Sequence, residues 1–203
     1  MQIHLLPGLS LNQDGRLVND NNDWVHLRQG DMDGACGPYC VVMSLLARKT
    51  AKREEFIPLN GIDYRTRAGK LLKELRTSDP MVLSGMDIKK LQELFTAHNT
   101  ASSEVEVGSS KQLLSSATNA IKDGLPVILG IKSRKSDELD HWTLAIGASN
   151  ECLYLLDPAY DLPVGNYWNA VLSVAPTSNR FGYRYMNAWN CCEVEADSIL
   201  VVN

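Results

Sequence analysis

A cysteine at a predicted helix start is the first candidate for chemistry in this sequence. Cys36 is followed by Gly37 and Pro38, and the apolar run that ends at Ala47 is long enough for a buried helix of about three turns. At a helix N-terminus the backbone amides and the helix dipole favour a thiolate, which is the nucleophilic form of cysteine. Cys36 is therefore the candidate nucleophile.

His141 and Asp157 are the candidates for the base and for the acid that orients it. His141 opens a predicted strand and Asp157 ends the next one. If the two strands form a hairpin that turns near Ser149, residues whose numbers sum to about 298 lie opposite each other, which pairs His141 with Asp157. A nucleophile, a base and a group that orients the base are what a thiol hydrolase requires.

Gln29 is the candidate for stabilising an oxyanion. It lies seven positions before Cys36, and its side-chain amide could act there together with the backbone N–H of Cys36.

The elements that must position these residues divide the chain into two parts. Residues 1–28 carry polar turn signals typical of a loop-rich lead-in with a hairpin. Helical patterns follow over 36–47, 68–75, 88–95 and 110–121, and strand patterns over 127–131, 141–147, 152–156 and 199–202. Helices followed by strands predict an α+β fold, in one domain over 1–203 with a charged helical elaboration at about 48–108.

The composition excludes several classes of protein. The chain has 203 residues, 44% of them hydrophobic, and a formal net charge of −4, which is ordinary for a globular protein and argues against a nucleic-acid binder. No apolar run reaches the roughly 18 residues of a membrane span. Because no Lys or Arg precedes Arg16 and the N-terminus has no sustained apolar stretch, we expect no signal peptide. The expected location is the cytoplasm, or a host or target cell reached by a secretion route that needs no signal peptide.

The other cysteines and histidines are not expected to do chemistry. Five cysteines, an odd number, do not indicate a disulfide framework, and their spacing does not match a zinc site, so neither a metal nor a cofactor is expected. We expect the four remaining cysteines to pack in the core, and His26 and His98 to lie at the surface. The four are Cys40, Cys152, Cys191 and Cys192.

Three blocks of sequence, in order along the chain, resemble papain-like cysteine peptidases. The first runs from Gln29 through Cys36-Gly-Pro-Tyr-Cys to Leu46, the second is Asp140-His141-Trp-Thr-Leu-Ala-Ile-Gly147, and the third is Leu155-Leu-Asp157-Pro-Ala. They are most similar to the branch of bacterial bacteriocin-processing, or leader-cleaving, peptidases. The resemblance covers residues 27–48 and 109–160.

The resemblance implies a fold and a set of roles. The fold would have the nucleophile at the N-terminus of a helix that packs on an antiparallel sheet formed by the second half of the chain. Cys36 would supply the thiol, His141 the base, Asp157 the orienting acid and Gln29 the oxyanion hole. The chain is then expected to hydrolyse peptide bonds of a specific protein or peptide substrate through a thioester acyl-enzyme.

Two alternatives stay open at this stage. The same site could deamidate, transglutaminate or acylate a protein side chain, because the acyl-enzyme can start from glutamine or end on another nucleophile. The chain could also be a non-catalytic module that binds a partner. Residues 48–79 hold nine basic and five acidic side chains and could dock an acidic protein.

Two further questions are left by the sequence. The aromatic run at 181–189 could wall the cleft or fill the core. A compact, selective protease suits a delivered effector or toxin as well as an intracellular processing enzyme.

Overall fold

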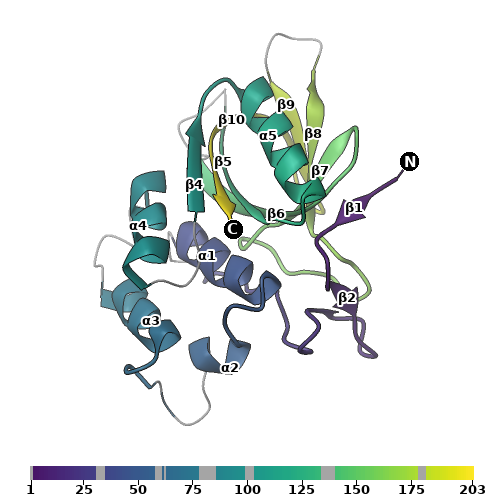
Figure 1. Ribbon diagram of the computed structural model, residues 1–203. Coiled ribbons are helices and arrows are strands. Elements are labelled where there is room, and N and C mark those ends of the chain that lie inside the picture. Colours follow the sequence, from purple (N-terminus) through teal and green to yellow (C-terminus); the bar gives the residue numbers. More distant parts are fainter. Residues whose placement is uncertain are drawn as a thin grey trace.

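The computed structural model describes residues 2–30, 35–57, 61, 63–77, 86–98, 103–133, 140–177 and 182–203 (Figure 1). Its helices are α1 (Cys36–Ala47), α2 (Arg53–Phe56), α3 (Arg67–Thr77), α4 (Ile88–His98) and α5 (Ser110–Lys122). Its strands are β1 (His4–Leu5), β2 (Ser10–Leu11), β3 (Leu17–Val18), β4 (Ser103–Val107), β5 (Val127–Ser133), β6 (Asp140–Ala148), β7 (Cys152–Leu156), β8 (Ala170–Pro176), β9 (Tyr183–Asn187) and β10 (Cys191–Val202).

The sheet closes on itself. Antiparallel pairing runs through β6, β5, β10, β9, β8 and β7, and β7 pairs again with β6, which makes a closed antiparallel barrel. Two more strands join this sheet: β1 pairs with β6, and β4 pairs with β10. The mixed helix and strand content agrees with the α+β prediction. The layout differs from the expected sheet, because β8 and β9, which the sequence did not predict, complete the ring.

The lead-in and α5 form as their sequences predict. β2 and β3 make a small hairpin in the lead-in. The hydroxyl of Ser109 accepts from the backbone N–H of Gln112, while the Gln112 amide oxygen accepts from the N–H of Ser109, so a capping box starts α5. Gly124 follows the helix with a φ of 81°, a conformation that glycine adopts without strain. α5 packs against β10 and β6.

α1 is buried along almost its whole length and packs against β6 and β5 of the barrel. Figure 1 shows α2 and α3 on the side of α1 that faces away from the barrel, whereas α4 lies beside β4 and also contacts β10. A methyl group at Gly37 would come within 3.0 Å of Leu91 on α4 and 3.2 Å of Trp142 on β6. Glycine therefore lets the first turn of α1 lie close to the strand that carries His141.

The helices of the described segments include none that is long and apolar enough to cross a membrane.

Candidate active site

The His141 ring joins Cys36 and Asp157. Its Nε2 atom lies 2.7 Å from Oδ1 of Asp157, and the Cys36 thiol lies near enough to the ring to raise its pKa. Cys36 lies at the start of α1, His141 near the start of β6, and Asp157 directly after β7. The structure therefore brings together the three residues that the sequence selected as a set.

Cys36 is the first residue of α1, and only 7% of its surface is exposed. Among the described residues, no side chain caps this helix N-terminus and none in its first turn is acidic. The helix start therefore keeps the electrostatic character that favours a negative charge on a nearby sulfur atom.

The Asp157 carboxylate is buried and uses both of its oxygens. Oδ1 accepts from the His141 ring and, at 2.8 Å, from the backbone N–H of Ala159, while Oδ2 accepts from the hydroxyl of Tyr185. Asn169 holds the backbone of the same residue. Its Oδ1 accepts from the N–H of Asp157 at 2.7 Å, and its Nδ2 donates to the Asp157 carbonyl at 2.8 Å.

These contacts stabilise the charged forms of both partners. Burial opposes a charge on His141, but its hydrogen bonds to Asp157 and Cys36 and the charges of those groups outweigh burial and raise its pKa to about 10. Burial likewise opposes a charge on Asp157, yet His141, Tyr185 and the Ala159 amide hold its pKa below the ordinary value. At neutral pH the site therefore holds an imidazolium against a carboxylate.

The hairpin register differs from the one expected. Leu144 lies opposite Leu156 and Ala148 opposite Leu153, with an irregularity between Ala145 and Gly147. Continued, this register would place residue 143 rather than His141 opposite residue 157. The two side chains still meet because β7 ends at Leu156, and the chain then turns so that the Ala159 amide bonds Oδ1 of residue 157.

Gln29 lies beside the loop that follows Asp157. Its backbone N–H donates to the carbonyl of Pro158 at 2.8 Å. Its side-chain Oε1 is buried and has no hydrogen-bond partner among the described residues. The segment that leads to Cys36 is thus tied to the loop that carries the acid.

Tyr185, Asn169 and His26 also contact Asp157, and the sequence did not identify them. His26 was expected at the surface, but it is partly buried, and its Nε2 donates to the Asp157 carbonyl at 3.4 Å. Burial is the main reason that its pKa is lowered, so the ring is neutral at neutral pH. The aromatic run at 181–189 was the feature of the sequence that pointed to Tyr185, which lies buried on β9. Trp189, at the end of the same run, is 82% exposed. The side chain of His98 lies outside the described residues.

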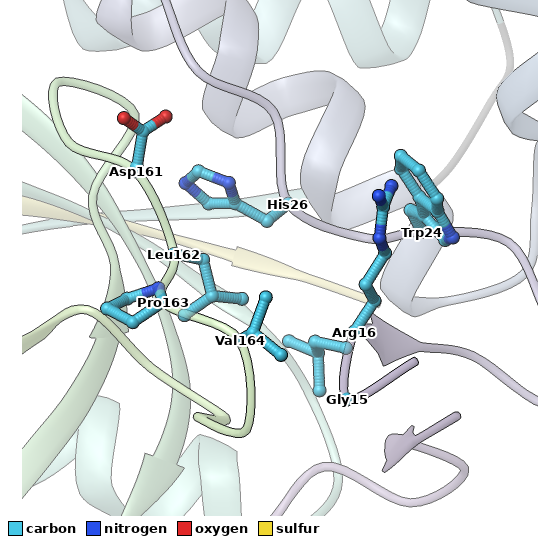
Figure 2. Close-up of a pocket in the computed structure, with 9 residues that line it drawn as sticks. Gly15, Arg16, Trp24, His26, Asp161, Leu162, Pro163 and Val164 are labelled. Atoms are coloured by element: carbon cyan, nitrogen blue, oxygen red, sulfur yellow. The ribbon is translucent and has the colours of Figure 1, made fainter. Parts of the chain in front are cut away.

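A cavity of about 360 Å³ opens beside His26. Residues 15–17, Trp24 and His26 line one wall, and residues 161–164 line the other. Figure 2 shows Arg16 stacked on the Trp24 ring, whose centroid lies 3.4 Å from the guanidinium carbon. The backbone N–H of Gly165 donates to the carbonyl of Gly15 and joins the two walls.

The remaining thiols differ in exposure. Cys40 is fully buried on α1, as expected for core packing, and burial raises the pKa of its thiol well above the ordinary value. Cys152 and Cys192 are partly buried, and burial raises the pKa of both. Cys191 is exposed, so its expected place in the core was wrong: β10 begins at this residue, beyond the part of the strand that the core covers.

Comparison with known proteins adds little to the geometry. No protein-family model matches the sequence, and no curated protein matches it. One solved structure that aligns with this chain is that of a presumed C39-like peptidase from Bacillus anthracis. It has a TM-score of 0.41 and 13% sequence identity, and the match covers 88% of this chain and 94% of that one. A likeness at this level carries no argument, so the assignment below depends on the site.

Proposed function

We propose that this chain is a papain-like cysteine peptidase of the bacteriocin-processing type, with Cys36 as nucleophile, His141 as acid and base, and Asp157 as the orienting residue. The observation that supports this most strongly is that one histidine ring contacts both the thiol at a helix start and a buried carboxylate. Such a triad activates a thiol for attack on an acyl group.

In the proposed acylation step, the Cys36 thiolate attacks the carbonyl carbon of a peptide bond and forms a tetrahedral oxyanion. The His141 imidazolium gives its proton to the leaving nitrogen, the C–N bond breaks, and an amine leaves. The acyl group stays on Cys36 as a thioester. General acid catalysis of this kind is worth roughly 10²–10⁴-fold.

In the proposed deacylation step, His141 is neutral and acts as a base. It takes a proton from water, and the water oxygen attacks the thioester carbonyl. The C–S bond then breaks, which releases a carboxylic acid and returns the thiolate and imidazolium pair. Asp157 stabilises the imidazolium in both steps.

Gln29 is the proposed side-chain donor to the oxyanion, together with the backbone N–H of Cys36. Two observations support this role. The backbone N–H of Gln29 donates to the carbonyl of Pro158, the residue after Asp157, and its amide oxygen is buried without a hydrogen-bond partner among the described residues.

The proposed substrate is a protein or a peptide. The cavity beside His26, whose ring bonds the backbone carbonyl of Asp157, has an apolar wall at 162–164. It could hold an apolar side chain of the substrate, away from the bond that is cut. The basic stretch at 48–79 is a further proposed contact for an acidic partner. Arg53 in this stretch is already engaged, because it donates to the carbonyls of Trp24 and His26.

Mass spectrometry of a protein and peptide library treated with the wild-type chain tests this function. The matched control is Cys36→Ala, and Cys40→Ala controls for loss of a thiol on the same helix. We expect new peptide termini with the wild type and with Cys40→Ala, and none with Cys36→Ala. Glutamine side chains converted to acids or to conjugates would favour the deamidase or transferase alternative. A library left unchanged by the wild type would favour a binding module.

A further inference from the structure

We infer that Tyr185 is a positioning residue for the proposed reaction: its hydroxyl holds the Asp157 carboxylate in the orientation that the His141 ring requires. This inference rests on the proposed function, because it concerns the same acid. It assigns a role to β9, which lies in a part of the chain outside the three blocks that suggested the peptidase.

The geometry of the carboxylate supports this role. Oδ1 of Asp157 receives the His141 ring and the Ala159 amide, and Oδ2 receives the Tyr185 hydroxyl. Rotation of the carboxylate about its bond to Cβ would break bonds on both oxygens. Without Tyr185, Oδ2 would lose its hydroxyl donor, and a buried carboxylate oxygen without a donor is costly.

Tyr185 is itself fixed in place. It is 3% exposed, and β9 holds its backbone opposite Cys192 on β10 and Leu172 on β8. The side-chain amide of Asn187 donates to the Tyr185 oxygen at 3.3 Å. Because that oxygen accepts from Asn187, its own proton is directed to Asp157.

The charged groups nearby keep Tyr185 a donor. Among the described residues, the titratable groups that face the pair include His141 from β6, Cys40 from α1, Tyr160 from the loop after β7, and His26 from the lead-in, which contacts the Asp157 backbone carbonyl. Burial and the negative charge of Asp157 raise the pKa of Tyr185 far above its ordinary value, so it remains protonated. A residue that only filled the barrel core would need the ring but not the hydroxyl.

Alkylation of Cys36 by iodoacetamide, followed across pH by peptide mass spectrometry, tests the inference without a known substrate. Tyr185→Phe removes the hydroxyl and keeps the ring. A less firmly held Asp157 weakens the thiolate and imidazolium pair, so we expect the pH of half-maximal alkylation to rise by about 1 unit. This shift corresponds to a roughly tenfold change in an equilibrium constant, which is what loss of a hydrogen bond to a charged group produces. Tyr183→Phe, on the same strand but lining a different cavity, is expected to keep the wild-type profile.

Each outcome decides the inference. A Tyr185→Phe profile that superimposes on the wild type overturns it, and so does an equal shift in Tyr183→Phe. If Tyr185→Phe does not fold, replacement of Tyr185 by 3-fluorotyrosine keeps the ring and changes the strength of the donor, and a profile identical to the wild type again overturns the inference. If Cys36 of the wild type is no more reactive than Cys191 at any pH, the proposed function fails first, and the two failures are thereby distinguished.

Discussion

Replacing Asp157 by asparagine separates the effect of its charge from the effect of its shape. Asp157→Asn keeps an oxygen that can accept from His141 Nε2 but removes the negative charge. In the wild type the contacts with Asp157 are the largest of the effects that raise the His141 pKa to about 10, against the opposing effect of burial. In the variant the effects of burial and of Cys36, which oppose each other, remain while the charge of Asp157 is gone, so the His141 pKa should fall to about its ordinary value of 6.5.

The size of the effect follows from those two pKa values. At pH 8, an imidazole with a pKa of about 10 is about 99% protonated, whereas one with a pKa of 6.5 is only about 3% protonated. The population of imidazolium available to pair with the Cys36 thiolate therefore falls about thirtyfold in Asp157→Asn. Peptidase activity at pH 8 should fall at least as much, because the imidazolium is also the proton donor to the leaving amine.

Titration of the histidine rings by ¹⁵N-edited NMR measures this directly. The chain has four histidines, and the spectrum of His141→Gln identifies the signal that belongs to His141. We expect a histidine that titrates near pH 10 in the wild type and at about 6.5 in Asp157→Asn. A wild-type His141 that titrates near its ordinary pKa would refute the reasoning, and so would a variant in which it still titrates near pH 10.

The remaining predictions concern activity and stability. Cys36→Ala and Cys36→Ser should abolish turnover, and wild-type rates in either variant would exclude Cys36 as the nucleophile. Gln29→Ala should lower kcat by roughly 10²–10³-fold and leave residual activity, as for loss of one oxyanion donor. Steady-state kinetics measures the effect of each variant. Asn169→Ala should lower the free energy of unfolding by about 1–3 kcal/mol, because it leaves the backbone N–H and carbonyl of Asp157 without these partners; urea denaturation measures it, and an unchanged midpoint would contradict it. Because the folded pKa of His141 lies above its unfolded value, its stabilisation is complete below pH 6.5 and is lost as pH rises toward 10; the Tm of the wild type should fall over this range, and the Tm of His141→Gln should fall less.

Local signals were sufficient for the elements that carry the triad. The apolar run that ends at Ala47 predicted α1, and continuous apolar runs predicted β6 and β7. The pairing of His141 with Asp157 followed from a hairpin with a short turn, which the structure confirms through the bond from the Ser149 N–H to the Cys152 carbonyl. The register was wrong because the hairpin turns later than at Ser149: Ala148 already lies opposite Leu153, and the irregularity between Ala145 and Gly147 shifts the pairing by only one position.

Closure of the barrel could not be predicted in the same way. β8 and β9 are exposed at alternate or irregular positions, and a long connection separates β7 from β8, so their strand character depends on pairing with β7 and β10. Tyr185 and Asn169 reach Asp157 only after that pairing has formed. Contacts between residues this far apart in sequence arise from tertiary structure rather than from local preference.

The pH dependence of iodoacetamide alkylation at Cys36, compared with the exposed thiol of Cys191 in the same sample, tests the central claim most directly. Peptide mass spectrometry locates the modified residues, and His141→Ala is the matched variant. We predict that Cys36 is alkylated selectively at and below about pH 7 in the wild type and that His141→Ala abolishes this selectivity. Alkylation of Cys36 that resembles that of Cys191 at every pH, or that is unchanged in His141→Ala, would contradict the account.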